Sequence, residues 1–410
     1  MNFDNPANLG VLACPGGDSF AEEVIVHLRK LYRRHFERRV RELAETYHLD
    51  RDAVIRKFNF IRDSLSPNAA VPGDILAYRC PHIQVPARFS LFANGEIKAE
   101  ILESIRGRDI FIVQDVENHY PVNFNDGNTS KVMTVNDHLM AVFVAVDAAN
   151  QAGAGQVTLV LPTYPYSRQH KKKGREGLTA SRVGKIFETL GVNRIITLDL
   201  HSREIGSAFN SMRLENLHAS YQIIRSLAVA KEIGGDMVLV APDTGAVDRN
   251  KFYATTLKKP LALLYKERDY SKVSSDALDS NIAVIKLLGN VKGKTVFMAD
   301  DMLATGGTLL KAMQVLKDEG AKKIICAVSL PLFSGDAVSH FDAAYKEGYF
   351  FRIIGTNAVY HEELLKREWY ISVNIATLFA KTISRLHQGL SLSSLLDNRA
   401  VINKLLSETQ

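Results

Sequence analysis

Short apolar runs rich in β-branched residues recur through this chain, and each is followed by turn residues and a helix-like pattern. In chain order they are LGVLAC, DIFIVQD, QVTLVLP, RIITLDL, MVLVAPD, LALLYKE, TVFMAD, KIICAVSL and FFRIIGT. Helical patterns lie between several of them, as in HLMAVFVAVDAANQAG, LTASRVGKIFETLG and TLLKAMQVLKDEG. Strands that alternate with helices form parallel sheets flanked by helices. The sequence therefore predicts an α/β fold.

The length of 410 residues is enough for two domains with separate cores. Each half contains several strand–loop–helix units, and this weak two-fold rhythm divides near Ser220. We expect an N-terminal domain of residues 1–220 and a C-terminal domain of residues 221–410. The last two helical patterns, VNIATLFAKTISRLHQG and NRAVINKLL, could return to cover the first domain.

The net charge of +6 comes from one segment. Residues 29–65 contain 11 Lys/Arg and 6 Asp/Glu, so the rest of the chain is close to neutral. Apolar residues recur there at helical spacing, which predicts a basic helical insertion over about 29–82. Such a helix can bind nucleic acid or a membrane surface. We favour a helix that packs one apolar stripe on the domain and leaves its arginines in solvent, with no nucleic acid as partner.

Two further features indicate a cytoplasmic protein without a membrane partner. The chain contains no apolar run of membrane-spanning length, and MNFDNPANLG lacks the pattern of a signal peptide. Cys14, Cys80 and Cys326 are far apart and show no metal-ligand spacing. Cys326 lies in the apolar run KIICAVSL, so a buried thiol in a reducing compartment is the expectation.

The segment TVFMADDMLATGGT combines an apolar strand with Asp300 and Asp301 where that strand is expected to end. Thr305, Gly306, Gly307 and Thr308 then lead into a helix. Glycines let the backbone approach a phosphate, and the N–H groups of the first helical turn point toward it. The acids can bind ribose hydroxyls or hydrated magnesium. The segment predicts a sugar-phosphate site; the alternative is an ordinary strand–turn–helix whose acids cap the helix.

Three other polar segments follow predicted strands. The loop YPYSRQHKKKGR places Arg168 and Arg175 among lysines, which suits a polyphosphate. His201 follows RIITLDL and Asp243 follows MVLVAP, and a histidine nitrogen with a carboxylate oxygen makes a partial shell for magnesium. Ligands bind at the carboxyl ends of strands in open α/β sheets, so these segments are candidates for one function.

The segment YKERDYSK supplies two cations, Lys266 and Arg268, around one acid. We expect both cations on a loop after the strand LALLYK. Such a pair suits a mobile clamp on a transferring phosphoryl group.

The order of these motifs resembles the ribose-phosphate pyrophosphokinases, also called phosphoribosyl-pyrophosphate (PRPP) synthetases. The resemblance rests on FANGE, RGRDIFIVQ, VNDHLM, LPTYPYSRQHKK, LDLHSREI, APDTGAVDR, YKER, DDMLATGGT and FSGDAV. It covers roughly residues 88–389, with the first strand and helix near 9–28. It implies two phosphoribosyltransferase-like domains in tandem, in subunits that assemble into dimers or hexamers.

The resemblance also implies residue roles. Adenine of ATP, bound at a subunit boundary, would contact Phe92, Asn94 and Glu96, and ATP would further contact Arg168, Gln169 and Arg175. Magnesium on the triphosphate would be held by His201 and Asp243. Lys266 and Arg268 would lie on the flexible catalytic loop. Ribose 5-phosphate would be bound by Asp300, Asp301, Thr305, Gly306, Gly307 and Thr308.

The implied reaction is diphosphoryl transfer: the anomeric hydroxyl of ribose 5-phosphate attacks the β-phosphorus of ATP, which gives PRPP and AMP for nucleotide biosynthesis. Two alternatives stay open. One is a non-catalytic, synthetase-like regulatory subunit, and the other is a phosphoribosyltransferase that acts on a base. The chain departs from the family pattern at Ala304, where a third acid is usual, and at His170, where an aspartate is usual.

Overall fold

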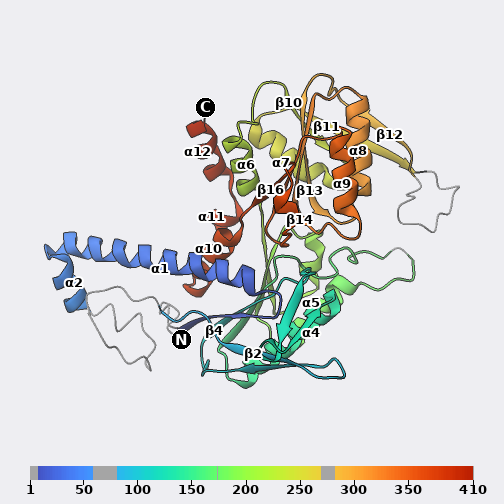
Figure 1. The fold of residues 1–410 in the computed structure, drawn as a ribbon. Coiled ribbons are helices and arrows are strands. Elements are labelled where there is room, and N and C mark those ends of the chain that lie inside the picture. The colour runs from blue at the N-terminus through green and yellow to red at the C-terminus, as the bar shows by residue number, and fades with distance from the viewer. Residues whose placement is uncertain (1–7, 59–80, 173, 269–281, 410) are drawn as a thin grey trace. The chain divides into compact units, whose positions relative to one another are not determined.

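The structure is a computed structural model that describes residues 8–58, 81–172, 174–268 and 282–409. The chain forms two compact units (Figure 1). Unit 1 is Met1–Leu217 with Ala376–Leu396, and unit 2 is His218–Ile375 with Asp397–Gln410. Each unit has its own sheet flanked by helices, so the predicted α/β fold is confirmed.

Unit 1 is built on five parallel strands that lie side by side in chain order. They are β1 (Leu9–Ala13), β4 (Asp109–Val113), β7 (Gln156–Val160), β8 (Arg194–Leu198) and β9 (Arg213–Leu217). Helices α4 (Val135–Gln151) and α5 (Thr179–Thr189) share one core with alternate residues of these strands. The first four strands come from predicted runs; β9 was missed because RLENL lacks the apolar run of a buried strand.

Two antiparallel hairpins are added to unit 1. One pairs β2 (Ala87–Leu91) with β3 (Ile97–Ile101), and the other pairs β5 (Pro121–Phe124) with β6 (Thr129–Val132). The 3₁₀ helix η2 (Asn125–Gly127) connects the second pair, and η3 (Arg203–Ala208) follows β8. Asn125 joins the hairpins, since its side chain accepts from Leu91 N–H (3.1 Å) and donates to Leu91 O (3.2 Å).

Helix α1 (Asp18–Tyr47) contacts β1 and β4 with its first half and lies beside α10 (Ala376–His387) (Figure 1). Phe20 and Phe379 meet edge to face, with ring centroids 5.2 Å apart. Helix α10 and α11 (Ser393–Leu396) thus return to unit 1 as expected. Helix α12 (Arg399–Thr409) does not, because it packs on α6 and α7 of unit 2, where Ile402 is fully buried.

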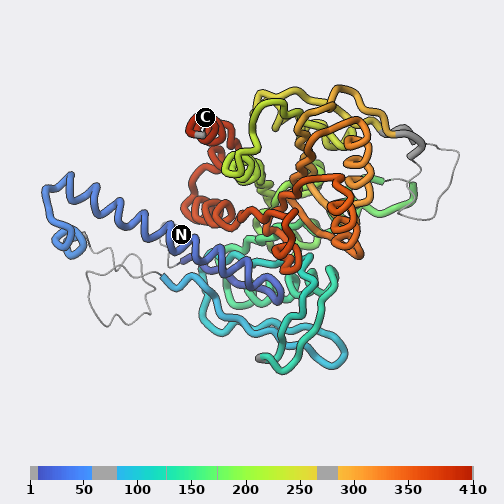
Figure 2. Tube along the Cα trace, turned by 45° about the horizontal axis from the view of Figure 1, so that its top comes forward, coloured from blue at the N-terminus to red at the C-terminus, as the bar shows by residue number. Residues whose placement is uncertain are grey.

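The basic segment forms the second half of α1 and the short helix α2 (Arg51–Phe58), which folds back on it (Figure 2). Val40, Val54 and Ile55 make a small core between the two helices. The arginines are mostly exposed, and some pair with local acids, such as Arg51 with Glu37. The prediction that the apolar stripe packs on the domain is therefore wrong for this half of α1, because its apolar residues pack against α2 instead. Residues 59–80 of the predicted insertion, with Cys80, lie outside the described residues.

Unit 2 is built on seven strands in an order that differs from chain order. Across the sheet they are β12 (Ile282–Leu288), β11 (Leu261–Arg268), β10 (Met237–Ala241), β13 (Thr295–Leu303), β14 (Lys323–Pro331), β15 (Arg352–Thr356) and β16 (Tyr370–Val373). All neighbours are parallel except β11 and β12. The chain runs outward from β10 through β12 and returns on the other side as β13. The pair β10–β13 is therefore a topological switch point, where open α/β sheets bind ligands.

Helices flank this second sheet. They are α6 (Ser220–Val229), α7 (Val247–Leu257), α8 (Gly307–Asp318) and α9 (Ala337–Lys346), with η4 (Thr244–Ala246) and η5 (Leu364–Lys366). The core under α8 and α9 is aromatic, with Phe333, Phe341 and Trp369 in contact. Within the described chain, no helix has the length and apolar character needed to cross a membrane.

Candidate functional site

Asp243 follows β10 at the carboxyl edge of the unit 2 sheet. Its Oδ1 accepts a hydrogen bond from the Ala246 N–H at 3.0 Å, which caps the short helix η4 and fixes the side chain. The residue is half-buried. A carboxylate has two oxygens with about four acceptor sites, so the capping role is compatible with ligand binding by the same group.

Asp300 and Asp301 lie on the neighbouring strand. The prediction that β13 ends at these acids was wrong, because pairing with β14 continues to Leu303 opposite Pro331. The Asp301 N–H donates to Asp300 Oδ1 at 2.9 Å. Burial, then the charge of Asp301, then that of Asp243 raise the pKa of Asp300 to about 7. Three carboxylates therefore repel one another at this edge, and a cation would relieve that repulsion.

A buried asparagine on α7 holds the strand just before these acids. The β10–β13 ladder ends at Leu239 opposite Phe297. Beyond it, Asn250 Nδ2 donates to Ala299 O (2.8 Å), and the Ala299 N–H donates to Asn250 Oδ1 (2.9 Å). The amide thus replaces a neighbouring strand. Nothing in the sequence marks this residue, since an asparagine in a helical pattern carries no sign of such a role.

The glycine turn after β13 is a backbone requirement. Gly306 has φ +73°, and a Cβ added there would lie 2.3 Å from Phe341 Cε2. Helix α8 begins at Gly307. Its N-cap residue is Gly306, which has no side chain, so no side-chain cap hydrogen bond forms at this position. Thr305 and Thr308 are exposed beside it. The uncapped N–H groups and the helix dipole suit a phosphate.

Lys266 and Arg268 belong to β11, which reaches Arg268. The prediction that both lie on a loop was therefore wrong for their backbone, because β11 is extended by antiparallel pairing with β12: Lys266 lies opposite Ile285 and Arg268 opposite Ile282. A bulge at Glu267 and Arg268 marks the irregular end of this pairing. The segment that follows, residues 269–281, lies outside the described residues.

In unit 1, FANGE is the turn between β2 and β3. The Phe92 N–H donates to Glu96 O and the Gly95 N–H to Phe92 O, both at 2.9 Å, and Gly95 has φ +92°. Phe92 is 51% exposed at the tip, and Asn94 and Glu96 are exposed beside it. An exposed phenyl ring with polar neighbours suits a planar base.

The basic loop between β7 and α5 presents Arg168, Gln169 and Arg175 to solvent. Its backbone is held at Gln169, whose N–H donates to Tyr166 O (2.8 Å) and whose carbonyl oxygen accepts from the Ala180 N–H (3.3 Å); Tyr166 has φ +57°. No sequence motif marks Glu117, which also belongs here. Burial raises the pKa of Glu117 to about 7, and the charge of Arg168 acts in the opposite direction.

His201 follows β8 through a strained turn in which Asp199 has φ +40°. The Leu200 N–H donates to Asn216 Oδ1 at 2.8 Å, which ties this turn to β9. His201 is exposed, and its ring meets that of His170 edge to face at 5.0 Å between centroids. The two loops that follow β7 and β8 are thus brought together.

Magnesium fits the donors at these edges, since clustered carboxylates and an imidazole are groups that bind divalent ions with phosphates and water. Across the described residues, no group of three His, Cys, Asp or Glu is arranged to hold an ion alone. Any ion would therefore depend on substrate phosphates and water for part of its shell.

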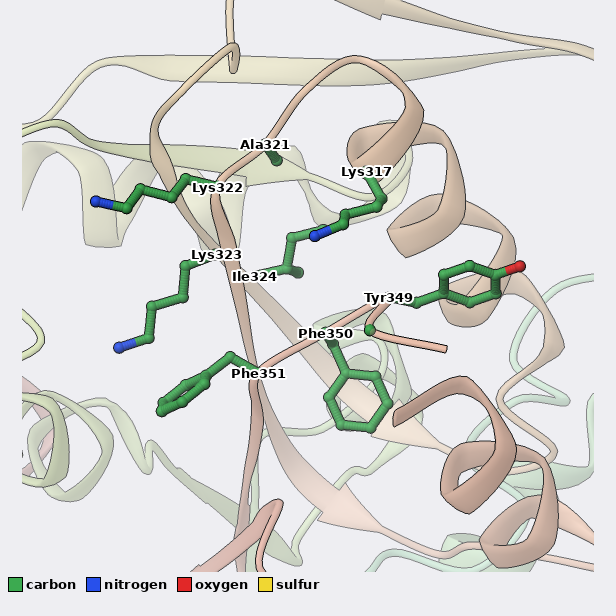
Figure 3. Close-up of a pocket in the computed structure, with 9 residues that line it drawn as sticks. Lys317, Ala321, Lys322, Lys323, Ile324, Tyr349, Phe350 and Phe351 are labelled. Carbon is green, nitrogen blue, oxygen red and sulfur yellow. The ribbon is translucent and has the colours of Figure 1, made fainter. Parts of the chain in front are cut away.

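A cavity of about 350 Å³ in unit 2 lies elsewhere (Figure 3). It opens where β14 and β15 begin, at the edge opposite Asp300. Figure 3 shows its lining side chains, which include Lys317, Lys322, Lys323 and Phe351. Because no predicted site residue lines it, we assign it no part in the chemistry of the Asp300 edge.

Comparisons with known proteins agree with this arrangement. Residues 78–191 match the family described as the N-terminal domain of ribose phosphate pyrophosphokinase, and residues 211–347 match the phosphoribosyl transferase domain. Ribose-phosphate pyrophosphokinase A of Dictyostelium discoideum is 35% identical over 75% of this chain and 89% of its own. The ribose-phosphate pyrophosphokinase of Caldanaerobacter subterraneus subsp. tengcongensis is 32% identical over 74% and 87%.

A solved structure extends the likeness to the fold. The crystal structure of phosphoribosylpyrophosphate synthetase from Mycobacterium smegmatis superposes with a TM-score of 0.66 at 25% identity, over 93% of this chain and 99% of that one. The sequence similarity covers both units and most of each relative's length. This chain belongs to the ribose-phosphate pyrophosphokinase family.

Proposed function

We propose that this chain transfers the diphosphate of ATP to the anomeric hydroxyl of ribose 5-phosphate, giving PRPP and AMP for nucleotide biosynthesis. The observation that carries the proposal is the unit 2 switch point. There, Asp243, Asp300 and Asp301 lie next to the uncapped N-terminus of α8. That combination matches a phosphorylated sugar whose hydroxyls face acids, in a chain whose relatives are named for this reaction.

The acceptor is assigned to unit 2. The 5-phosphate would sit on the first turn of α8, where Thr305, Gly306, Gly307 and Thr308 offer N–H groups and hydroxyls. The ribose hydroxyls would donate to Asp300 and Asp301. Gly307 supports this placement, because a Cβ there would meet nothing within 4 Å in the protein, so the space beside it is open to a ligand.

The nucleotide is assigned to unit 1. The adenine would lie against the exposed ring of Phe92, with Asn94 and Glu96 as polar contacts. Arg168, Gln169 and Arg175 would bind the nucleotide from the basic loop, since guanidinium groups pair bidentately with phosphate oxygens. Magnesium bound with the triphosphate would supply charge neutralisation. His201 would be a ligand for such an ion in unit 1, and Asp243 would be a ligand for an ion at the unit 2 edge.

Positioning and charge stabilisation account for the chemistry. The attacking oxygen is the anomeric hydroxyl of the sugar, and the bond that breaks joins the α- and β-phosphates, so AMP leaves with the oxygen between them. Lys266 and Arg268 are proposed to stabilise the charge of the transferring group. No covalent intermediate with the protein is required.

We also propose a cytoplasmic homo-oligomer, either a dimer or a hexamer. Two observations support this. Cys14 and Cys326 are free, buried thiols, as suits a reducing compartment. Phe92 is a large apolar side chain exposed on a hairpin tip, as suits a surface that a ligand or a second subunit covers. The mass of the purified protein in solution tests the assembly.

The activity is tested by incubating the protein with magnesium, ATP and ribose 5-phosphate while AMP and PRPP are measured. We expect both products in equal amounts. AMP formation no greater than in a control without the sugar would refute the proposal. Consumption of added PRPP with a nucleobase would point to a base phosphoribosyltransferase instead.

The catalytic cations are tested by Lys266→Ala, with Lys322→Ala as the matched control. Lys322 is an exposed lysine of the same unit at the opposite edge of the sheet. We expect Lys266→Ala to abolish turnover with an unchanged circular dichroism spectrum, and Lys322→Ala to keep wild-type turnover. Wild-type activity in Lys266→Ala would remove Lys266 from the mechanism.

A further inference from the structure

His170 and His201 form a pair of imidazoles in unit 1 that come from two different loops. His170 follows Gln169 after β7, and His201 follows β8. Their ring centroids are 5.0 Å apart, and the rings are inclined at 73°. His170 directly follows Gln169, which the proposed function assigns to the nucleotide, and His201 is the residue that it assigns to the metal ion in unit 1.

The spacing of the two rings fits shared ligation of one cation. A metal–nitrogen bond of about 2.0–2.1 Å places an imidazole centroid roughly 3.2 Å from the ion. Two rings bound at octahedral or tetrahedral angles then have centroids roughly 4.5–5.2 Å apart. The observed separation falls within that interval.

A second observation is independent of the ring contact. The Nδ1 atom of His170 is buried, and within the described part of the chain it has no hydrogen-bond partner. A buried polar atom without a partner costs about 1–3 kcal/mol, and a water molecule or an ion can remove that cost. A bound cation, or a water in its shell, would satisfy this nitrogen.

The surrounding charges indicate how a cation reaches the pair. Lys171 and Lys172 follow His170 directly and are exposed, as is Arg168. These side chains repel a free cation and attract a triphosphate. An ion that arrives with the nucleotide therefore has access to the pair at the smallest electrostatic cost.

We propose that His170 is a second imidazole ligand beside His201, and that the pair shifts the metal preference of this site from Mg²⁺ toward imidazole-binding ions such as Co²⁺. The inference rests on the proposed function for the nucleotide and for His201 as a ligand of its metal ion. Mg²⁺ is a hard ion that prefers oxygen, whereas first-row transition ions gain from each added imidazole nitrogen. Loss of His170 should therefore weaken Co²⁺ much more than Mg²⁺.

The test is calorimetric titration of the protein with Co²⁺ and with Mg²⁺, each without nucleotide and with a non-hydrolysable ATP analogue. In His170→Gln, Co²⁺ affinity should fall about tenfold or more, while Mg²⁺ affinity changes less than about twofold. His340→Gln is the control, since His340 is exposed on α9 of unit 2. Unfolding curves check that both variants are folded.

A spectroscopic readout separates ligation from a structural role. Co²⁺ bound to the wild type should show visible ligand-field bands that change in His170→Gln. In His170→Cys, a thiolate-to-cobalt charge-transfer band should appear and Co²⁺ affinity should recover. Equal losses of Co²⁺ and Mg²⁺ in His170→Gln, or no new band in His170→Cys, would overturn the proposal. These measurements need no turnover, so a failure of PRPP synthesis would leave them interpretable.

Discussion

The side-chain amide of Asn250 makes two hydrogen bonds with the backbone of Ala299, at 2.8 and 2.9 Å, and so takes the place of a strand neighbour. The same amide donates to Ala246 O at 2.8 Å, in the turn that carries Asp243. One fully buried side chain therefore positions both acidic segments of the unit 2 switch point. Its removal should affect stability and ligand binding together.

We predict that Asn250→Ala lowers the free energy of unfolding by about 2–4 kcal/mol, because buried N–H and C=O groups lose their partners. The KM for ribose 5-phosphate should rise, since β13 is no longer held one residue before Asp300. Urea unfolding and steady-state kinetics measure the two effects. Lys251→Ala, at an exposed position on the same helix, should change neither. An Asn250→Ala protein with wild-type stability would refute the role of Asn250 in holding β13 and the Asp243 turn.

Two adjacent glycines give a matched pair of variants. Gly306→Ala combines a left-handed φ with a Cβ 2.3 Å from Phe341, so it should lower the free energy of unfolding by about 2–5 kcal/mol and also weaken sugar-phosphate binding. Gly307→Ala adds a Cβ that meets no protein atom within 4 Å. It should therefore keep wild-type stability within about 1 kcal/mol, while its Cβ obstructs the phosphate. Ribose 5-phosphate binding that is unaffected in Gly307→Ala would remove the phosphate from this turn.

The acidic cluster predicts opposite effects on the metal-free and metal-bound proteins. Asp301→Asn removes one of the charges that raise the pKa of Asp300, so the metal-free variant should be more stable than the wild type at pH 8. Mg²⁺ with ribose 5-phosphate should then raise the melting temperature less in the variant, because fewer carboxylates attract the ion. Thermal melts with and without both ligands measure this. A metal-dependent increment equal to that of the wild type would contradict the assignment.

The sequence predicted most of the parallel strands of both units, because each of these is a run of apolar, β-branched residues; β9, with RLENL, was missed. It could not predict β12 or β16 in the same way. Both strands lie at the edges of the unit 2 sheet: YISV of β16 is short, and IAVIKLL of β12 is an apolar run that periodicity alone does not distinguish from a buried helical segment. Edge pairing with β12 is also the reason why Lys266 and Arg268 lie on a strand.

Site residues that belong to a local sequence motif could be predicted. Site residues that depend on contacts made only in the folded protein could not. Asp243, Asp300 and the glycine turn stand in recognisable segments. Asn250, Glu117 and the contact between His170 and His201 depend on residues far apart in the sequence. Periodicity reports which side of an element is buried, and it carries no information about which distant side chain lies there.

The last prediction concerns Glu117, whose pKa is raised from its ordinary 4.5 to about 7 by burial, against the opposing charge of Arg168. The folded protein therefore binds this proton more tightly than the unfolded chain. The resulting stability is fully present below pH 4.5 and is lost as the pH rises through about 7.

Glu117→Gln should remove about 2–3 kcal/mol of this pH dependence. Urea unfolding at pH 5 and pH 8 measures it, and the difference between wild type and variant cancels the contribution of Asp300, which titrates over the same range. In Arg168→Ala the loss should shift to higher pH, because the opposing charge of Arg168 is removed; a shift to lower pH would contradict the influence of Arg168 on Glu117.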